Sequence, residues 1–567
     1  MSQSPPCSRI AFLNTTNVYA PDGSDNSSAE RKRSPSTSDA GRDAKRVKLS
    51  YEDTPEETQS KRTEIGNALT RIEPPKHAIL TTRSSLMMAP LSTLRRYPAL
   101  STRPILRSFV SSNKTDVFRC YATEGQHMSN PYACGYSHDA KRGGTHLLAI
   151  ATESGAVHVL NATKRDEWDC GMSFPLYELT TPYLHNDKEP QRVVWSPHNN
   201  GLFDIQWSPS DTLLATASGD QTTRISSLAS SVSSEDKVLC VLRGQESTVR
   251  CVAWDPSRDD ILCTGGRNGS ICVWDLRVGE GRSHVISDFD TGSAVSGILA
   301  PVLVVPGAHE DSGRQLKPRG RKGKITPSST LHSITNLLYD EANPTCIISS
   351  GSTDGILRKW DLRLPIETTG KSKKPAKTRT SSVCISSCDP TTFQGVRRAR
   401  GIVSLESGRG PTAGLLYALG TDARIHTYSA TSLEPLSGYR SDSLADDPFV
   451  FSHPELQTNS FYVHLALSPC GRWLACGSAT GGRAFLFDVS NTASAGYVRH
   501  DRHNLQEDAV VLRGQMGEVG ALDWAEGSLA TCADDTTVRI WRPDIERAGI
   551  CVEGSEEMKW TWSWAEQ

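Results

Sequence analysis

A tight turn between two short strands recurs along this chain, and this repeat constrains the fold more than any other feature. From about residue 145, each unit has a strand of small and apolar residues, a turn rich in Gly, Asp and Ser, and a second alternating strand. Seven such units occur, at 147–161, 213–227, 261–275, 347–361, 415–429, 473–488 and 528–542. A unit this short buries little apolar surface alone, so we expect the units to stack radially into a closed ring.

Several residues in these units have roles that strand geometry explains. Four aspartates stand at turns, where a carboxylate can accept backbone N–H bonds: Asp220, Asp354, Asp422 and Asp535. Tryptophan occurs at the ends of three second strands, where its ring can be buried between sheets: Trp274, Trp360 and Trp541. A further strand ending in Trp or Ser-Pro precedes several units, at 203–210, 249–257, 463–471 and 519–524. The pattern predicts an all-β protein.

These units resemble the WD repeat, and the resemblance covers about residues 100–545. It implies a seven-bladed WD-repeat β-propeller, whose ring closes when one end of the chain pairs with the other. The departures are Ser226, where Trp is expected, and Gln245 and Gln515, where the Gly-His pair of the repeat has become Gly-Gln. Residues 115–122 are the candidate closing strand, and residues 558–564 are the rival.

Composition divides the chain into three parts. Residues 1–90 are rich in Ser, Thr, Pro and charged residues, and such a segment cannot bury enough apolar surface to offset its ordering entropy. We therefore expect a disordered N-terminal extension at 1–90, the propeller at 91–545 and a short C-terminal segment at 546–567. Within the propeller, basic loop insertions are expected at about 280–330 and 364–400.

Two basic clusters in the N-terminal extension resemble a two-part nuclear import signal. The clusters contain Arg31, Lys32, Arg33, Lys45, Arg46 and Lys48. The alternative is a solvated run of charge, which is the usual role of a basic tail. Ser34 follows the first cluster and precedes a proline, as in a proline-directed kinase site. No apolar signal segment and no run of eighteen apolar residues occurs, so we expect a nuclear protein.

No motif in the sequence predicts catalysis or a cofactor. No Gly-rich phosphate loop precedes a helix, and no Gly-x-Ser-x-Gly occurs. The fifteen cysteines are scattered without the Cys/His spacing of a zinc site. The carboxylates that can be placed lie at turns, where bracing the turn is a simpler role than acid–base chemistry. We therefore expect a non-catalytic recognition protein without a cofactor or a metal.

Two units end in the same tetrapeptide, Trp-Asp-Leu-Arg, at residues 274–277 and 360–363. Blade packing does not require the arginine, which could be a solvated side chain at the rim or a partner for an aspartate of the next blade. The doubling favours another role. Arg277 and Arg363 would project from one face of adjacent blades and could together bind carboxylates of another protein.

The doubled motif resembles that of substrate receptors of cullin-4 RING ubiquitin ligases. The resemblance implies that the ligase adaptor, the damage-specific DNA-binding protein subunit, docks on Trp274, Asp275, Arg277, Trp360, Asp361 and Arg363. Segments 215–225, 263–277, 349–363 and 461–478 resemble, in order and spacing, the denticleless family. That family implies a receptor that presents PCNA-bound replication proteins, such as the licensing factor, for ubiquitination. The resemblance does not extend to the long tail with a PCNA-binding box that animal members carry.

The first loop insertion contains a basic segment without interleaved aromatic residues. Residues 314–324 hold six basic residues and no acid, among them Lys317, Arg319, Arg321, Lys322 and Lys324. A second basic run lies at 371–379. Solubilising charge is one interpretation. The other is electrostatic attachment to DNA phosphates or to an acidic partner surface.

A second class of function stays open at this point. The chain could be a nuclear WD-repeat scaffold of the histone-binding or ribosome-assembly type, with no attachment to a ligase. The doubled Trp-Asp-Leu-Arg favours the receptor, whereas an acidic propeller face with a bound histone peptide would favour the scaffold.

Overall fold

The computed structural model describes residues 102–566 with several gaps. The gaps are 124–126, 165–191, 229–236, 280–285, 288–293, 296, 311–331, 366–380, 396–397, 437–446, 493–508, 555 and 557. The chain divides into two compact units, and all described residues belong to the second, Leu94–Gln567. The expected N-terminal extension, 1–90, lies outside the described residues.

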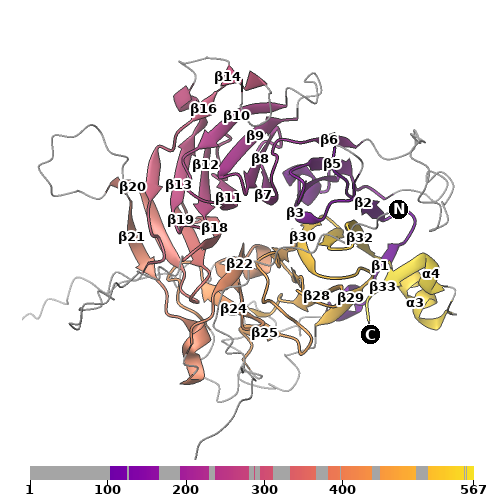
Figure 1. Ribbon diagram of the computed structural model, residues 1–567. Coiled ribbons are helices and arrows are strands. Elements are labelled where there is room, and N and C mark those ends of the chain that lie inside the picture. Colours follow the sequence, from indigo (N-terminus) through magenta and orange to yellow (C-terminus); the bar gives the residue numbers. More distant parts are fainter. Residues whose placement is uncertain are drawn as a thin grey trace, which may run out of the picture. The chain divides into compact units, whose positions relative to one another are not determined.

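Seven sheets surround a central axis in this unit, and each sheet is one blade of a β-propeller (Figure 1). Within a blade, antiparallel strands follow one another outward in chain order. The innermost strands of blades 1 to 7 are β3 (Pro131–Tyr136), β7 (Leu202–Trp207), β11 (Val249–Trp254), β18 (Ile334–Asp340), β22 (Ile402–Ser407), β26 (Leu465–Leu467) and β30 (Val519–Ala525). Each innermost strand contacts those of the two neighbouring blades. The predicted all-β, seven-bladed fold is confirmed for the described residues.

The remaining strands complete the blades in a regular way. The second strands are β4 (Leu147–Thr152), β8 (Leu213–Ser218), β12 (Ile261–Gly266), β19 (Asn343–Gly351), β23 (Leu415–Gly420), β27 (Trp473–Cys476) and β31 (Ser528–Ala533). The third strands are β5 (Val157–Asn161), β9 (Thr222–Ser227), β13 (Ile271–Asp275), β20 (Arg358–Pro365), β24 (Arg424–Ser429), β28 (Arg483–Asp488) and β32 (Thr537–Pro543). The fourth strands of blades 1 to 6 are β6 (Val193–Trp195), β10 (Val238–Arg243), β17 (Leu303–Val305), β21 (Ser381–Ser386), β25 (Val450–Ser452) and β29 (Val510–Arg513).

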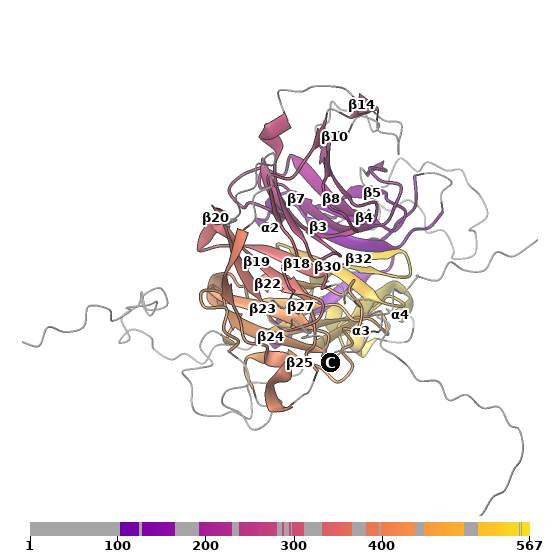
Figure 2. The same ribbon diagram turned by 60° about the vertical axis from the view of Figure 1, so that its left-hand side comes forward.

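A few short elements lie outside this scheme. β16 (Ile298–Leu299) pairs in parallel with β10, and β14 (Ile286–Ser287) pairs with β15 (Ala294–Val295). The described helices are α1 (Arg103–Leu106), α2 (His138–Lys141), α3 (Ile545–Glu553) and α4 (Met558–Thr561), with 3-10 turns at Leu276–Gly279, Pro390–Gly395 and Gly410–Thr412. None of these helices is long and apolar enough to cross a membrane. Figure 2 shows α3 and α4 beside the last blade.

Both ends of the described chain contribute to ring closure. β1 (Phe109–Ser112) and β2 (Val117–Arg119) pair with β32 and form the fourth strand of blade 7, and β33 (Trp562–Trp564) then pairs with β1. β2 lies within the predicted closing segment 115–122, and β33 lies within its rival 558–564. Figure 1 shows the indigo start of the described chain beside its yellow end. Both segments therefore take part in closing the ring, and they are not alternatives. We call the paired strands β32, β1, β2 and β33 the seam.

Tryptophans at the ends of three innermost strands link each of these strands to the preceding blade. The indole N–H groups donate to backbone carbonyl oxygens in the pairs Trp207–Gly135 at 2.8 Å, Trp254–Gln206 at 3.2 Å and Trp524–Ala466 at 3.1 Å. All three rings are buried, so water does not compete for these bonds.

Glutamine replaces histidine in a network behind the third strands of blades 3 and 7. In blade 3, the indole of Trp274 donates to Thr264 Oγ1 at 3.0 Å, and the Gln245 amide donates to the same oxygen at 3.3 Å. In blade 7, Thr531 Oγ1 accepts from Trp541 at 3.0 Å and donates to Gln515 Oε1 at 2.7 Å. The Gly-Gln departures therefore preserve a bonded network.

Two histidines that sequence analysis did not single out form this network in blades 2 and 4. His198 contacts Asp220 at 2.7 Å and Thr216 at 3.0 Å, and His309 contacts Ser349 at 2.9 Å. Burial lowers the pKa of both imidazoles, which are therefore neutral at pH 7. Pro197 and Ala308 precede them instead of glycine, so the Gly-His pattern does not identify them.

The missing tryptophan of blade 2 is compensated from the neighbouring blade. The indole of Trp195, at the end of β6 in blade 1, donates to Ser226 Oγ at 3.3 Å. Trp195 is buried, and the ammonium group of Lys237 lies 5.8 Å from its ring centroid. The Trp195 ring of the adjacent blade therefore contacts Ser226, at the position where the repeat usually has a tryptophan of its own.

We predict that the seam depends on one ion pair. Arg542 of β32 pairs with Asp116, which is buried beside β2, and Arg542 Nη2 also donates to the Ala162 carbonyl at 2.6 Å. Arg542→Met leaves a buried carboxylate without its cation, so the free energy of unfolding in urea should fall by about 3 kcal/mol.

The matched control for this prediction is Arg513→Met. Arg513 binds Glu566 at 2.7 Å and Glu455 at 3.3 Å, but each of these side chains is more than 40% exposed, so its loss should lower the free energy of unfolding by less than about 1 kcal/mol. Equal losses in the two variants would mean that the seam is not held by the Arg542–Asp116 pair.

Candidate functional site

The two Trp-Asp-Leu-Arg motifs lie where the third strands of adjacent blades end. β13 carries Trp274 and Asp275 in blade 3, and β20 carries the second motif in blade 4. The innermost strands of these blades, β11 and β18, contact each other. Third strands run in the same direction in every blade, so both motifs lie on one face of the propeller. We call this the motif face, defined by residues 275–277 and 361–363.

The tryptophan of each motif anchors the end of its strand. Trp274 is 1% exposed and Trp360 is 4% exposed. The indole of Trp360 donates to Ser349 Oγ at 2.9 Å, which matches the Trp274–Thr264 bond in blade 3. The residues that follow therefore start from a fixed backbone position.

The aspartate and the arginine of each motif bind each other. Asp275 Oδ1 accepts from the Arg277 backbone N–H at 3.0 Å and from its Nε at 2.9 Å, and Asp275 Oδ2 accepts from Nη2 at 2.7 Å. The corresponding distances for Asp361 and Arg363 are 2.9, 3.1 and 2.9 Å. In each blade, the aspartate carboxylate therefore binds both the backbone N–H and the guanidinium of the arginine two residues later.

This geometry adds a local partner to the solvated rim position that the sequence suggested. The Arg277 and Arg363 side chains are 56% and 64% exposed, and each is paired with the aspartate of its own motif. Arg277 has a second carboxylate at 2.9 Å, that of Asp260. The hydrogen bonds from the arginines lower the pKa of Asp275 and of Asp361, so both carboxylates are ionised at pH 7.

Other blades use the end of the third strand differently. In blade 6, Asp488 is at the position of the motif aspartate, but its partners are Ser490 and Thr102. In blade 7, Arg542 directly follows the tryptophan and turns toward Asp116. Among the described residues, the paired aspartate–arginine arrangement at a third-strand end occurs only in blades 3 and 4.

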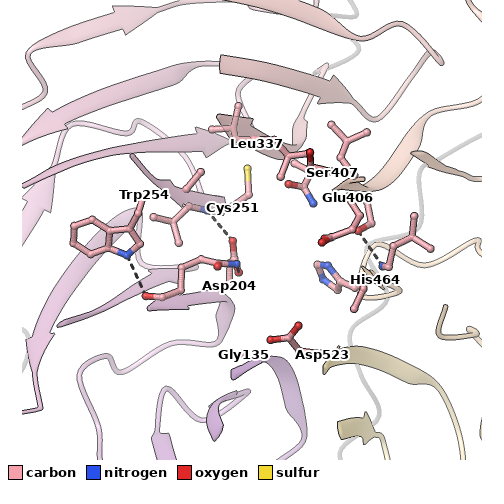
Figure 3. A pocket seen from close by; sticks show the side chains of 18 of the residues that line it. Gly135, Asp204, Cys251, Trp254, Leu337, Glu406, Ser407, His464 and Asp523 are labelled. Atoms are coloured by element: carbon pink, nitrogen blue, oxygen red, sulfur yellow. Dashed lines mark hydrogen bonds between the residues drawn. The ribbon is translucent and has the colours of Figure 1, made fainter. Parts of the chain in front are cut away.

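A polar cavity of about 350 Å³ lies in the central channel, between the innermost strands (Figure 3). Its carboxylates are held by specific donors. Asp204 accepts from Val252 N at 2.8 Å, Asp523 binds Lys141 at 2.9 Å, and Glu406 binds Arg409 at 2.8 Å.

These channel carboxylates brace the propeller instead of forming a reactive cluster. Burial raises the pKa of Asp204 to about 6 and also raises the pKa of Glu406. Asp204 and Asp523 each accept a backbone N–H from the innermost strand of the next blade. Among the described residues, no three His, Cys, Asp or Glu side chains are placed to hold a metal ion.

The remaining candidate residues lie outside the described part of the chain. They are the import clusters (Arg31, Lys32, Arg33, Lys45, Arg46, Lys48), the basic loop (Lys317, Arg319, Arg321, Lys322, Lys324) and Ser34. Import, loop attachment and phosphorylation stay predictions from sequence.

Comparison with known proteins agrees with this architecture. The family model "WD domain, G-beta repeat" matches residues 189–225 and 236–275. "Denticleless protein homolog B" of Xenopus laevis is 27% identical over 73% of this chain and 48% of its own length. "Cell division cycle protein cdt2" of Schizosaccharomyces pombe is 27% identical over 84% of this chain and 85% of its own length. "Denticleless protein homolog" of Homo sapiens is 26% identical over 73% and 46%. The chain thus spans about half the length of these two vertebrate relatives.

We predict that the motif tryptophans, and not the motif arginines, support the fold. Removing both exposed arginines, Arg277→Ala with Arg363→Ala, should lower the free energy of unfolding by less than about 1 kcal/mol in total. Trp274→Ala alone should cost about 3–5 kcal/mol, because it leaves a large cavity and removes the indole hydrogen bond to Thr264. Urea unfolding of the two variants measures this difference. A loss for the double arginine variant as large as that for Trp274→Ala would make the arginines structural.

Proposed function

Because the chain is a WD-repeat homologue of the denticleless and cdt2 proteins over most of its length, we propose that it is a substrate receptor of a cullin-4 RING ubiquitin ligase. In this proposal the motif face docks on the ligase adaptor, the damage-specific DNA-binding protein subunit. The receptor then presents PCNA-bound replication proteins, such as the licensing factor, for ubiquitination. The observation that carries the proposal is the repeated Asp–Arg pairing at the third-strand ends of two adjacent blades.

The intramolecular pairing makes each arginine a preorganised docking group. A guanidinium has five N–H donors, so it can pair with more than one carboxylate at once. Here the aspartate fixes its orientation before any partner arrives, which reduces the side-chain entropy lost on binding. The same aspartate offsets part of the positive charge, which places each new bond near the low end of the usual range of about 1.5–3 kcal/mol for charged groups.

The receptor contributes recognition and placement rather than chemistry. In this proposal, ubiquitin transfer belongs to the other subunits of the ligase, and the propeller holds the substrate within their reach. The propeller has the rigidity that this task needs, because indole bonds and carboxylate bonds link its neighbouring innermost strands. The protein itself is therefore proposed to be non-catalytic.

We predict that the motif arginines are required for adaptor binding. In the double variant Arg277→Ala with Arg363→Ala, adaptor affinity should fall about hundredfold, since two charged hydrogen bonds of about 1.5 kcal/mol each are lost. Arg277→Lys with Arg363→Lys should also bind weakly, because lysine has no planar fork. The measurement is co-purification of the adaptor with the tagged receptor, followed by titration of the purified pair.

Arg472→Ala is the matched control for adaptor binding. Arg472 is exposed and lies between β26 and β27 of blade 6, on the same face as the motifs. Its loss should leave adaptor binding unchanged. Undiminished adaptor binding by the folded double arginine variant would overturn the docking proposal and favour a nuclear WD-repeat scaffold without ligase attachment.

We also predict that nuclear import depends on the second basic cluster. Replacing Lys45, Arg46 and Lys48 with alanine in a fluorescent fusion removes the charges that an import receptor would bind, so the fusion should shift to the cytoplasm. The first cluster, replaced separately, tests whether the signal has two parts. An unchanged nuclear signal after both replacements would show that import uses another route.

A further inference from the structure

An unusual group of side chains lies on the face opposite the motif face. Tyr132, Phe203 and Arg250 are each the second residue of an innermost strand, and Phe461 and Tyr462 shortly precede β26. In blade 3, Val249 pairs with Gly266 at the far end of β12, whereas Asp275 pairs with Ile261 at its start. Arg250 and Arg277 therefore lie at opposite ends of the same blade. We call the five residues the stacked-arginine cluster.

The cluster extends across the central channel. The Arg250 guanidinium carbon lies 4.9 Å from the ring centroid of Phe203 and 4.5 Å from that of Phe461. Tyr462 stacks on Phe203 at 6.0 Å and contacts Tyr132 at 4.5 Å. These residues come from blades 1, 2, 3 and 6, so rings on opposite sides of the axis meet at one arginine.

Blade 7 leaves room for this arrangement because it has a glycine at the corresponding position. Gly520 is the second residue of β30, and a Cβ atom there would lie 2.9 Å from the carbonyl oxygen of Tyr462. His464 N donates to the Gly520 carbonyl at 3.0 Å and holds the segment in place. The chain bearing Phe461 and Tyr462 therefore packs directly on the backbone of blade 7.

Arg250 is partly buried and has no hydrogen-bond acceptor among the described residues. Within the described part of the chain it makes no hydrogen bond or ion pair, and its contacts with the two phenyl rings are its only specific interactions. Its titratable neighbours are Tyr462, Cys251, Arg267 and His464, none of them a carboxylate. By contrast, Arg539 and Arg542 near the seam both bond side-chain oxygens. No nitrogen of Arg250 is both buried and unpaired, so its N–H groups are available to an anion from outside.

We propose that the stacked-arginine cluster binds an acidic peptide segment, in which an Asp or Glu carboxylate pairs with Arg250 and an adjacent apolar or aromatic side chain packs on Tyr132, Phe203 and Tyr462. Stacking engages the flat faces of the guanidinium and leaves its N–H edges for a planar, bidentate acceptor. A carboxylate has this shape. A phosphate would place further charged oxygens against the negative faces of the rings. This inference adds a substrate class to the proposed function. Peptide binding itself does not depend on that function; only the description of the peptide as a substrate rests on it.

The experiment uses the full-length protein and a random nonapeptide display library. Peptides selected by the wild-type protein should carry Asp or Glu beside an apolar or aromatic residue. For a selected peptide, Glu→Gln (or Asp→Asn) and Arg250→Met should each weaken binding about ten- to hundredfold by fluorescence anisotropy. The two changes combined should cause little further loss, because both remove the same contact.

Three control measurements distinguish binding at Arg250 from a general effect of charge or of misfolding. Arg258→Met removes an exposed arginine of the same blade near the motif face, and it should leave peptide binding unchanged. Arg250→Lys keeps the positive charge but loses the planar fork, so it should also bind weakly, and thermal melting verifies the fold of each variant. Adaptor co-purification should be normal in Arg250→Met, so failure of this proposal is distinguishable from failure of the docking proposal.

The proposal is overturned by any of four results. These are selection of no peptide, selection of peptides without a carboxylate, undiminished binding by Arg250→Met or Arg250→Lys, and tighter binding of the phosphoserine version of a selected peptide. The last result would assign the cluster to a phosphopeptide instead.

Discussion

The pairing of β1 with β32 is the interaction on which the rest of the structure depends. Each innermost strand is flanked by two others, and this holds for blades 7 and 1 only if the ring is closed. Val110 lies opposite both Arg542 and Trp564, so a strand from the start of the described chain is held between two strands from its end. An open seam would expose unpaired strand edges and the buried apolar residues between blades 7 and 1. The Arg542–Asp116 pair therefore adds a charged contact where the blade is assembled from distant segments.

Ring closure also fixes which residues share a face. Because every third strand runs in the same direction, the same tetrapeptide in two adjacent blades places two arginines on one rim, and no long-range contact is needed to align them. The local geometry is equally repetitive. The aspartate accepts the backbone N–H of the arginine two residues later and also binds its guanidinium. The same carboxylate therefore fixes the backbone at the strand end and the orientation of the arginine side chain. The proposed docking surface thus follows from repetition of a local rule.

Much of this fold could be predicted from the sequence, because the blade is a local unit. Turn spacing indicated seven blades, and Trp274 and Trp360 marked strand ends that the structure buries. Contacts between distant segments could not be predicted in this way. Trp195 reaches Ser226 from another blade, and both chain ends build the seam. The pairing of Asp275 with Arg277 is local, but the sequence analysis considered only solvent or an aspartate of the next blade as the partner of the arginine. Arg250 appears in sequence as an ordinary strand residue, and only ring closure brings Phe461 to it.

Arg277 and Arg250 show how context determines what a cation can do. Both belong to blade 3, at opposite ends of the sheet. Arg277 has carboxylates of its own chain at 2.7 and 2.9 Å, so a partner adds to an arrangement that is already neutralised and ordered. Arg250 has only ring faces as partners among the described residues, so a carboxylate that reaches it would be its first acceptor. The motif face is therefore suited to geometric fit over several contacts, and the stacked-arginine cluster to discrimination by a single charge. Because the two sites are on opposite faces, one blade could support both proposed partners at the same time.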